Sequence, residues 1–286
     1  MSGEDIGSCA SGAPELASLA LPELLKLALA EDVSSDRVWE LENEIARREL
    51  EESLPVAEKL LDADSPLERE LGAGIFRALA GSEVEERRAA GARLLLRVVD
   101  NESDPDMLVI AAIGLGHAGE ERALEPLVHL SEHRDEDVRD AVAFALPSVL
   151  RNTLDDRGVK ALIRLTQDAD EDVRDWATFG LGVGGLGQLD TPDIRRALQE
   201  RRKDESFAVR CEALEGLGIR GDIEALAEAL RLCDAGIEAV MMAEQAAAPE
   251  LYEPLLALKS RGGWPNTADL DQAIAACRPR QAGDVS

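Results

Sequence analysis

The chain has 286 residues, of which 31 are Lys or Arg and 58 are Asp or Glu, so its formal net charge is −27. Proteins that bind nucleic acid or an anionic membrane surface need clustered Lys and Arg, so this charge argues against both and favours a basic partner, although an acidic surface also serves solubility alone. Hydrophobic residues make up 45% of the chain but aromatic residues only 3%, which is typical of helices that pack through Leu, Ala, Val and Ile.

No segment of the sequence marks the chain for export or for a membrane. No stretch reaches the about 18 apolar residues that a membrane span requires, and the N-terminus lacks the basic and hydrophobic regions of a signal peptide. Cys9, Cys211, Cys233 and Cys277 show no spacing typical of a metal site or a redox motif. We therefore expect a soluble, cytoplasmic protein with reduced cysteines.

The N-terminal part of the chain predicts a disordered segment followed by a helical cap. Residues 1–13 are rich in Ser, Gly and Ala and are expected to be disordered. Residues 14–54 predict two helices, 14–30 and 36–54, with Leu, Val and Ile at helical spacing. We interpret the pair as a cap, because the end of a repeat array otherwise exposes core, and we expect Trp39 to fill that end.

Five segments within residues 55–247 can be laid over one another. Asp-Glu-Asp-Val-Arg-Asp occurs at 135–140 and again at 170–175, and a small residue followed by Leu comes seven residues after each valine. The equivalent apolar residues, here called anchors, are 40, 31, 35 and 36 residues apart: Leu67, Met107, Val138, Val173 and Val209. Such a period, with acidic turns between apolar helical segments, indicates stacked helical hairpins.

Each hairpin is predicted to have a first helix, an acidic turn and a second helix that begins near the anchor. The first helices are expected at 55–63, 84–99, 121–132, 156–167 and 191–202, and the second helices at 66–80, 105–117, 136–150, 171–184 and 206–219. A weaker sixth hairpin spans 222–247. Residues 248–278 are interpreted as a C-terminal helical cap, and 279–286 as a loose tail.

The repeated pattern, Leu-x-x-Leu and then Asp-x-Asp-x-x-Val-Arg-x-x-Ala-x-x-x-Leu-Gly, resembles HEAT-like repeats, in particular the short type first described in phycobilisome bilin lyases. One copy runs from Leu162 through Val173 and Arg174 to Leu181 and Gly182. The resemblance covers the repeat region and implies an all-α, right-handed superhelix whose second helices line the concave face. It says little about function, because such repeats serve adaptors, lyases, hydroxylases and scaffolds alike.

The resemblance also implies a role for the Arg that follows the anchor in the later repeats. In such repeats this Arg joins a ladder of ion pairs with the aspartates of adjacent turns. The residues expected to form the ladder are Arg139, Arg174, Arg210, Asp135, Asp137, Asp170 and Asp172. We interpret them as structural, because paired charges near helix N-termini need no ligand to explain them.

Large apolar residues stand three and six residues past the anchors of the middle repeats, at positions that the resemblance places on the concave face. The expected partner-binding residues are Ile110, Ile113, Phe144, Trp176 and Phe179, with Asp140 and Asp175 beside them. An apolar strip with acidic flanks fits a basic, amphipathic helix or peptide of another protein. The sequence leaves open the alternative that these side chains are buried against neighbouring repeats.

Signals for catalysis, metals and cofactors are weak. His129 and His133 are four residues apart but have no evident third metal ligand. Cys211 occupies the repeat position of Asp140 and Asp175 and is expected to be a packed thiol. The glycine-rich segment 182–187 lacks the strand and the Lys of a phosphate-binding loop and is interpreted as a turn between repeats. The sequence therefore predicts no catalytic residue, no metal and no cofactor.

These observations favour a non-catalytic scaffold or adaptor that holds a protein partner on an acidic, partly apolar concave face. One alternative is a lyase-like or chaperone-like accessory protein that acts on a cofactor-bearing protein, as the bilin-lyase resemblance implies. Another is a purely structural subunit of a larger complex.

Overall fold

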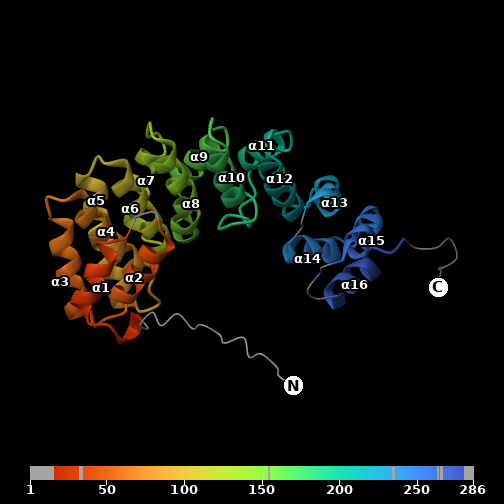
Figure 1. The fold of residues 1–286 in the computed structure, drawn as a ribbon. Helices are drawn as coiled ribbons and strands as arrows, with labels where there is room; N and C mark the ends of the chain where they lie inside the picture. The colour runs from red at the N-terminus through yellow and green to blue at the C-terminus, as the bar shows by residue number, and fades with distance from the viewer. Residues whose placement is uncertain are drawn as a thin grey trace, which may run out of the picture. The chain divides into compact units, whose positions relative to one another are not determined.

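The computed structural model describes residues 16–31, 35–153, 155–233, 236–262, 264 and 267–279. All regular elements within these ranges are helices, and they succeed one another as short antiparallel hairpins (Figure 1). The predicted class, an all-α solenoid, is thereby confirmed. The chain divides into two compact units, residues 1–94 and 95–286.

The first unit is a small helical bundle. Its helices are α1 (Leu21–Ala28), α2 (Asp36–Ala46), α3 (Leu50–Leu61), α4 (Pro66–Ala80) and the first part of α5 (Glu85–Asn101), with a 3-10 turn at Leu16–Ser18. Helix α4 packs against both α2 and α3. The fully buried side chains of Leu41, Ile45, Ile75 and Phe76 form the centre of this unit.

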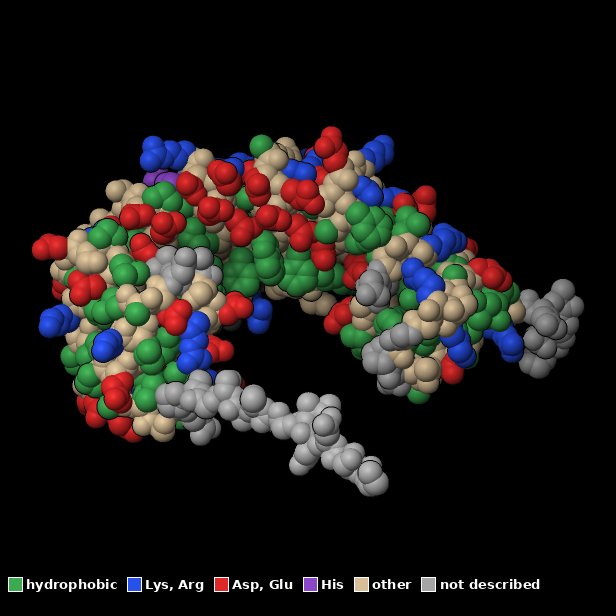
Figure 2. Space-filling model, in the orientation of Figure 1, with side chains coloured by type: hydrophobic (Ala, Val, Ile, Leu, Met, Phe, Trp, Pro, Cys, Tyr) green, Lys and Arg blue, Asp and Glu red, His purple; other side chains and the backbone are tan. Residues whose placement is uncertain are grey.

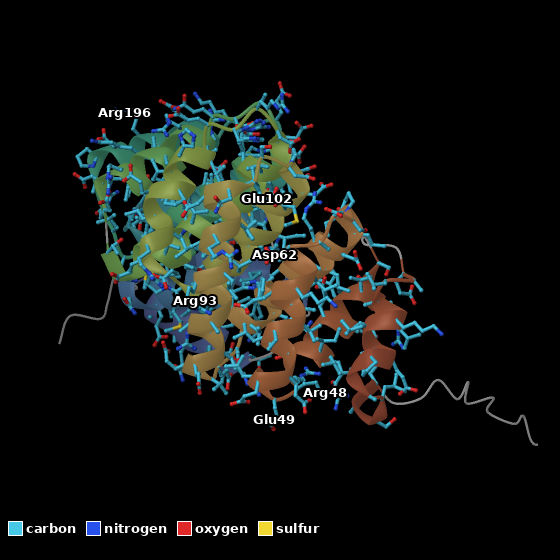
Figure 3. All side chains as sticks on the ribbon, turned by 90° about the vertical axis from the view of Figure 1, so that its left-hand side faces the viewer. Arg48, Glu49, Asp62, Arg93, Glu102 and Arg196 are labelled. Atoms are coloured by element: carbon cyan, nitrogen blue, oxygen red, sulfur yellow. A yellow bond between two sulfur atoms is a disulfide. The ribbon has the colours of Figure 1, made fainter. Side chains whose placement is uncertain are left out.

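The helix predicted over residues 36–54 is wrong, because the structure ends α2 at Ala46 and begins α3 at Leu50. Arg87 of α5 stabilises the break by donating to the carbonyl oxygens of Ala46, at 2.6 Å, and Arg48, at 2.7 Å. These donations satisfy carbonyls that the end of a helix leaves unpaired. Arg48 and Glu49 mark the turn in Figure 3. The partner that fixes this break is 39 residues away in sequence, so a local pattern does not reveal it.

The environment of Trp39 also differs from the prediction that its side chain fills the end of the repeat array. Its side chain is 44% exposed, and the guanidinium of Arg77 lies 3.4 Å above its ring. Arg77 forms an ion pair with Glu42, and both of these charged side chains are buried. The indole therefore covers a buried ion pair instead of contributing to the apolar core.

The second unit is a two-row stack of hairpins. We call one of these rows the inner row. It consists of α6 (Pro105–Ala118), α8 (Glu136–Thr153), α10 (Glu171–Leu181), α12 (Phe207–Ile219) and α14 (Ile237–Ala246). The outer row consists of α7 (Leu124–Leu130), which follows a 3-10 turn at Glu121–Ala123, α9 (Asp156–Leu165), α11 (Pro192–Arg201) and α13 (Ile223–Leu232). Successive inner helices pack side by side (Figure 1). A 3-10 turn at Pro249–Leu251, α15 (Tyr252–Arg261) and α16 (Thr267–Ala276) complete the unit.

The inner helices α6, α8, α10 and α12 begin at N-terminal caps formed by side chains. Asp104 accepts from the N–H of Asp106 at the start of α6, and Asp170 accepts from the N–H groups of Asp172 and Val173 at the start of α10. Each such bond satisfies a main-chain donor that the first turn leaves unpaired, which stabilises a helix by about 1 kcal/mol. Caps at these fixed positions keep the inner helices in the same register from one repeat to the next.

Glycines allow a close approach between α10 and α12. A methyl group placed on Gly216 would lie only 2.5 Å from the Cα of Gly182, so no larger residue fits there without displacing a helix. Gly182 also begins the loop that leads to α11. The glycines of the Gly-Leu-Gly triplets at 180–182 and 216–218 therefore allow adjacent helices to pack closely.

The loop after α10 is held by Arg220, which is only 8% exposed. Its guanidinium donates to five main-chain carbonyl oxygens at 2.6–3.2 Å, those of Leu181, Gly182, Leu186, Leu189 and Gly216. Burial lowers the pKa of Arg220, but a guanidinium remains charged in proteins. The glycine-rich segment is a turn between repeats, as expected, and its shape depends on this one buried cation.

We predict that Arg220→Met lowers the free energy of unfolding by about 3 kcal/mol or more, because it leaves buried carbonyl oxygens without a donor. Urea denaturation followed by circular dichroism measures the change. The control is Arg231→Met, since Arg231 is exposed, and it should change stability by about 0.5 kcal/mol at most. Equal effects of the two substitutions would contradict the role given to Arg220.

Candidate partner-binding face

Four ring-bearing side chains form a continuous row across the inner helices α6, α8 and α10. The ring of His117 lies 5.5 Å from that of Phe144, which lies 5.0 Å from Trp176, which in turn lies 5.9 Å from Phe179. Each pair meets edge to face, with interplanar angles of 85–86°, an arrangement that favours aromatic contact. We call these four residues the aromatic row.

The aromatic row is neither fully buried nor fully solvated. Trp176 and Phe179 each keep 38% exposure, and Phe144 is partly buried. Ile110 and Ile113 are also partly buried, on α6. Figure 2 shows a hydrophobic band over the middle of the second unit, where α8 and α10 lie. Of the two alternatives that the sequence leaves open, the structure therefore supports partial exposure.

His117 is a member of the row that the sequence analysis did not identify. It stands ten residues past its anchor, outside the positions compared between repeats. The signal that could have found it is helical spacing, because His117 lies four residues after Ile113, on the same face of α6. Its exposed ring extends the row to the end of that helix.

Acidic side chains run beside the aromatic row. They stand on three inner helices, two on each, in the first half of α8 and α10 and in the middle of α12: Asp137, Asp140, Asp172, Asp175, Glu212 and Glu215. We call these six residues the acidic ridge, and Figure 2 shows acidic side chains bordering the hydrophobic band over α8 and α10. Within the residues that the structure describes, neither Asp140 nor Asp175 forms an ion pair with Lys or Arg.

Three carboxylates of the ridge are short of hydrogen-bond partners. One oxygen each of Asp140, Asp175 and Glu212 is buried and has no partner among the described residues. Burial of a charged oxygen without a donor costs free energy. This cost favours the protonated, uncharged form of each carboxyl group.

Burial and mutual repulsion raise the pKa values of the same carboxyl groups. Burial, followed by the charges of Asp172 and Asp170, raises the pKa of Asp140 to about 6. Burial, followed by the charges of Glu215 and Asp175, raises the pKa of Glu212 to about 7. Burial is also the main reason why the pKa of Asp175 is raised. These three carboxyl groups are therefore protonated at a higher pH than exposed carboxyl groups.

The Glu212 carboxyl should make stability depend on pH. Its folded-state pKa lies above the ordinary value of 4.5, so its contribution to stability is present below that value and is lost as the pH rises through about 7. We predict that Glu212→Gln raises the Tm at pH 8 by about 2–5 °C and leaves it nearly unchanged at pH 4. Calorimetry at both pH values tests this. Glu205→Gln, at an exposed position, is the control; an equal shift in both variants would remove the basis of the prediction.

The expected ladder of ion pairs exists, but with different aspartates. Arg139 donates from Nε and Nη2 to the two carboxylate oxygens of Asp168, at 2.7 and 2.8 Å. Arg174 binds Asp204 in the same way, at 3.0 and 3.1 Å. Although burial alone would raise the pKa of Asp168, the hydrogen bonds from Arg139 lower it below its usual range. Arg210 donates instead to main-chain carbonyl oxygens, among them that of Asp204 at 2.7 Å.

The aspartates predicted for the ladder have other roles. Asp135 and Asp170 stand three residues before their anchors, where they accept from main-chain N–H groups and cap α8 and α10. Asp137 and Asp172 are exposed and belong to the acidic ridge. The pairing positions are five residues before the anchors Val173 and Val209, because those turn residues face the preceding repeat.

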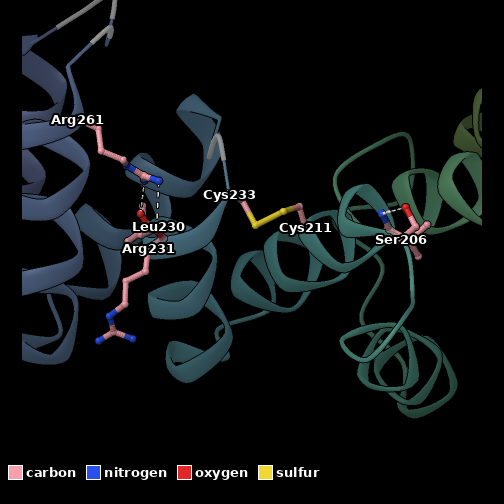
Figure 4. Close-up of a disulfide and its surroundings, with 7 residues drawn as sticks. Ser206, Cys211, Leu230, Arg231, Cys233 and Arg261 are labelled. Atoms are coloured by element: carbon pink, nitrogen blue, oxygen red, sulfur yellow. Dashed lines mark hydrogen bonds between the residues drawn. A yellow bond between two sulfur atoms is a disulfide. The ribbon is translucent and has the colours of Figure 1, made fainter.

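The expectation of reduced cysteines is wrong for one pair, since Cys211 of α12 forms a disulfide with Cys233 at the end of α13 (Figure 4). Their Cα atoms are 5.6 Å apart, within the range that a disulfide spans. Close to Cys233, Arg261 donates to the carbonyl oxygens of Leu230 and Arg231. The thiol of Cys277 is buried and donates to the carbonyl oxygen of Ala243, while Cys9 lies outside the described residues.

Other surface features provide no competing site. The described residues include no group of three or more His, Cys, Asp or Glu side chains placed to hold a metal ion. A depression of about 870 Å³ on the outer row is lined by Arg201 and Arg202. These two side chains already form ion pairs, Arg201 with Asp204 and Arg202 with Glu228. Among the described helices, none combines the length and the hydropathy needed to cross a bilayer.

Comparisons with known proteins agree with this architecture. A family model described as HEAT repeats matches residues 92–182 and 159–248, which together exceed half of the chain. An X-ray structure of YibA from Escherichia coli is 20% identical, covers 92% of this chain and 93% of its own, and has a TM-score of 0.68. An engineered protein is 18% identical, with 90% and 77% coverage and a TM-score of 0.54.

A designed armadillo repeat protein, solved in complex with the peptide (KR)4, is also 18% identical. It covers 70% of this chain and 98% of its own, with a TM-score of 0.50. At these identities the likeness shows the fold alone. No curated protein matches the chain. The predicted HEAT-like repeat is confirmed, whereas the bilin-lyase type is not.

Proposed function

This chain belongs to the HEAT-repeat family, and we propose that it is a non-catalytic scaffold or adaptor whose second unit holds a basic segment of a protein partner. The observation that carries the proposal is the aromatic row lying beside the acidic ridge on one row of helices. The apolar core and the Arg–Asp ladder also hold the repeats together.

The aromatic row supplies the anchors of the proposed interface. Half-exposed Trp and Phe side chains that already contact one another lose little conformational freedom on binding. Such residues dominate the binding energy of many interfaces, and Trp is the ring that best attracts a cation over its face. We therefore assign Phe144, Trp176 and Phe179 as central contacts, with Ile110 and Ile113 at one side.

The acidic ridge supplies the preference for a basic partner. Guanidinium or ammonium groups of a partner would pair with Asp140 and Asp175, which are partly exposed and form no ion pair with Lys or Arg among the described residues. The designed armadillo repeat protein, which has a similar fold, is described in complex with a peptide of alternating Lys and Arg. That complex supports the idea that stacked helical hairpins can hold an extended basic segment.

Binding of a basic peptide at the aromatic row and the acidic ridge can be tested with the (KR)4 peptide carrying a fluorescent label. We predict that the double variant Trp176→Ala/Phe179→Ala weakens its binding about tenfold or more, measured by fluorescence polarisation at fixed salt. Phe207→Ala is the matched control, because Phe207 is 54% exposed in the same unit but does not belong to the row. Circular dichroism verifies folding. If row and control variants bind alike, the proposed face is wrong.

Affinity for the same peptide should depend on pH. The ridge carries more negative charge above the raised pKa values of Asp140, about 6, and Glu212, about 7. We predict that binding strengthens about tenfold between pH 5.5 and pH 8, with protons released on binding. Calorimetry in two buffers of different ionisation enthalpy measures the release. A pH-independent affinity, or no release, would contradict a contact with these carboxyl groups.

A further inference from the structure

A second feature of the inner row lies beyond the aromatic row. A cavity of about 350 Å³ opens between the glycine-rich loop and α14. Val183, Ile219, Met241 and Met242 give it apolar side chains, the loop glycines contribute main chain, and Gln188 and Gln245 are polar members of its lining. Glu238 also lines it. The volume is at the lower end of the range for ligand pockets, so it suits one large side chain.

One wall of the cavity is already fixed. Arg220 holds the loop through its carbonyl oxygens, and a methyl group on Gly185 would lie 2.6 Å from the carbonyl oxygen of Pro147 in α8. The loop is therefore seated against the preceding repeat. The opposite wall carries two methionines, of which Met241 is 48% exposed, and thioether side chains adapt to the shape of an incoming ring.

The cavity adjoins the aromatic row. The N–H of Gly184, which lines the cavity, donates to the carbonyl oxygen of Phe179 at 2.8 Å. A methyl group on Gly184 would lie 3.2 Å from the Phe179 ring. The last ring of the row thus stands at the cavity wall, so one extended segment can contact both.

The negative charge of the ridge also continues to the cavity. The nearest carboxylate oxygens of Glu238 and Glu215 lie 2.9 and 3.9 Å from the point where a Cβ on Gly236 would stand. Acidic side chains therefore accompany the apolar surface from α8 to α14. A partner whose basic residues follow the ridge would reach the cavity without leaving a surface of matching charge.

From this continuity we infer that the cavity receives an aromatic side chain of the same basic segment. The inference rests on the proposed function and narrows it, since it assigns the partner class as a basic segment with an aromatic residue near one end. The ring would pack between the loop backbone and the thioethers of Met241 and Met242, where sulfur contacts favour an aromatic ring over an aliphatic side chain.

The chain offers a direct reporter, because it has only four methionines. Methyl-labelled methionine gives a short NMR spectrum in which Met107, buried at 1% exposure, serves as an internal reference. The probes are (KR)4 and two versions that carry Trp at either end through a Gly-Ser-Gly linker. We expect one Trp peptide to bind about tenfold more tightly than (KR)4 and to shift the Met241 and Met242 methyl signals while Met107 stays in place.

Substitutions distinguish the contribution of the cavity to affinity from that of the aromatic row. Met241→Gln/Met242→Gln should abolish the gain from Trp and leave the affinity for (KR)4 within about twofold. Leu232→Gln, at a residue 55% exposed elsewhere in the unit, should keep the gain. If (KR)4 binds but Trp adds no affinity, or adds it without moving the methionine signals, the cavity assignment is overturned and the proposed function stands. If no peptide binds, both are overturned.

Discussion

The second unit depends on a repeated, two-pronged contact between an arginine and an aspartate of the next repeat. Arg139 with Asp168 and Arg174 with Asp204 tie adjacent inner helices together, and both pairs are largely removed from solvent. Paired guanidinium and carboxylate groups hold a defined geometry better than a single ionic contact. The same arginines also donate to carbonyl oxygens of their own turns, so each one fixes a turn and a neighbour together.

The ladder also explains why acidic side chains remain uncompensated on the inner row. The cations closest in sequence to the acidic ridge are the ladder arginines, and their donors are already engaged. Burial is the main reason why the pKa values of Asp140 and Asp175 are raised, and no ion pair with Lys or Arg among the described residues lowers them again. A contact that serves packing thus determines the electrostatics of the surface beside it.

Much of this architecture could be predicted from the sequence, because local spacing and main-chain capping fix each hairpin. Proline and aspartate mark the helix starts, and the anchors recur at one face of each second helix. Other features depend on contacts between residues distant in sequence. They are the break at Arg48, the ladder partners Asp168 and Asp204, and the disulfide at Cys211. A periodic pattern names the positions that face inward, but it does not say which side chain reaches which neighbour.

The ladder keeps the same register relative to the anchors in successive repeats: each arginine directly follows its anchor, and each aspartate stands five residues before the next anchor. A hairpin duplicated in this register would carry its own arginine, its own receiving aspartate and its own share of the exposed strip. The array could therefore lengthen by whole units without a redesigned junction, and its reach along an extended molecule would grow in steps of one helix spacing, about 8–10 Å. Gene duplication or protein engineering could extend the array in the same way, by adding one hairpin in this register.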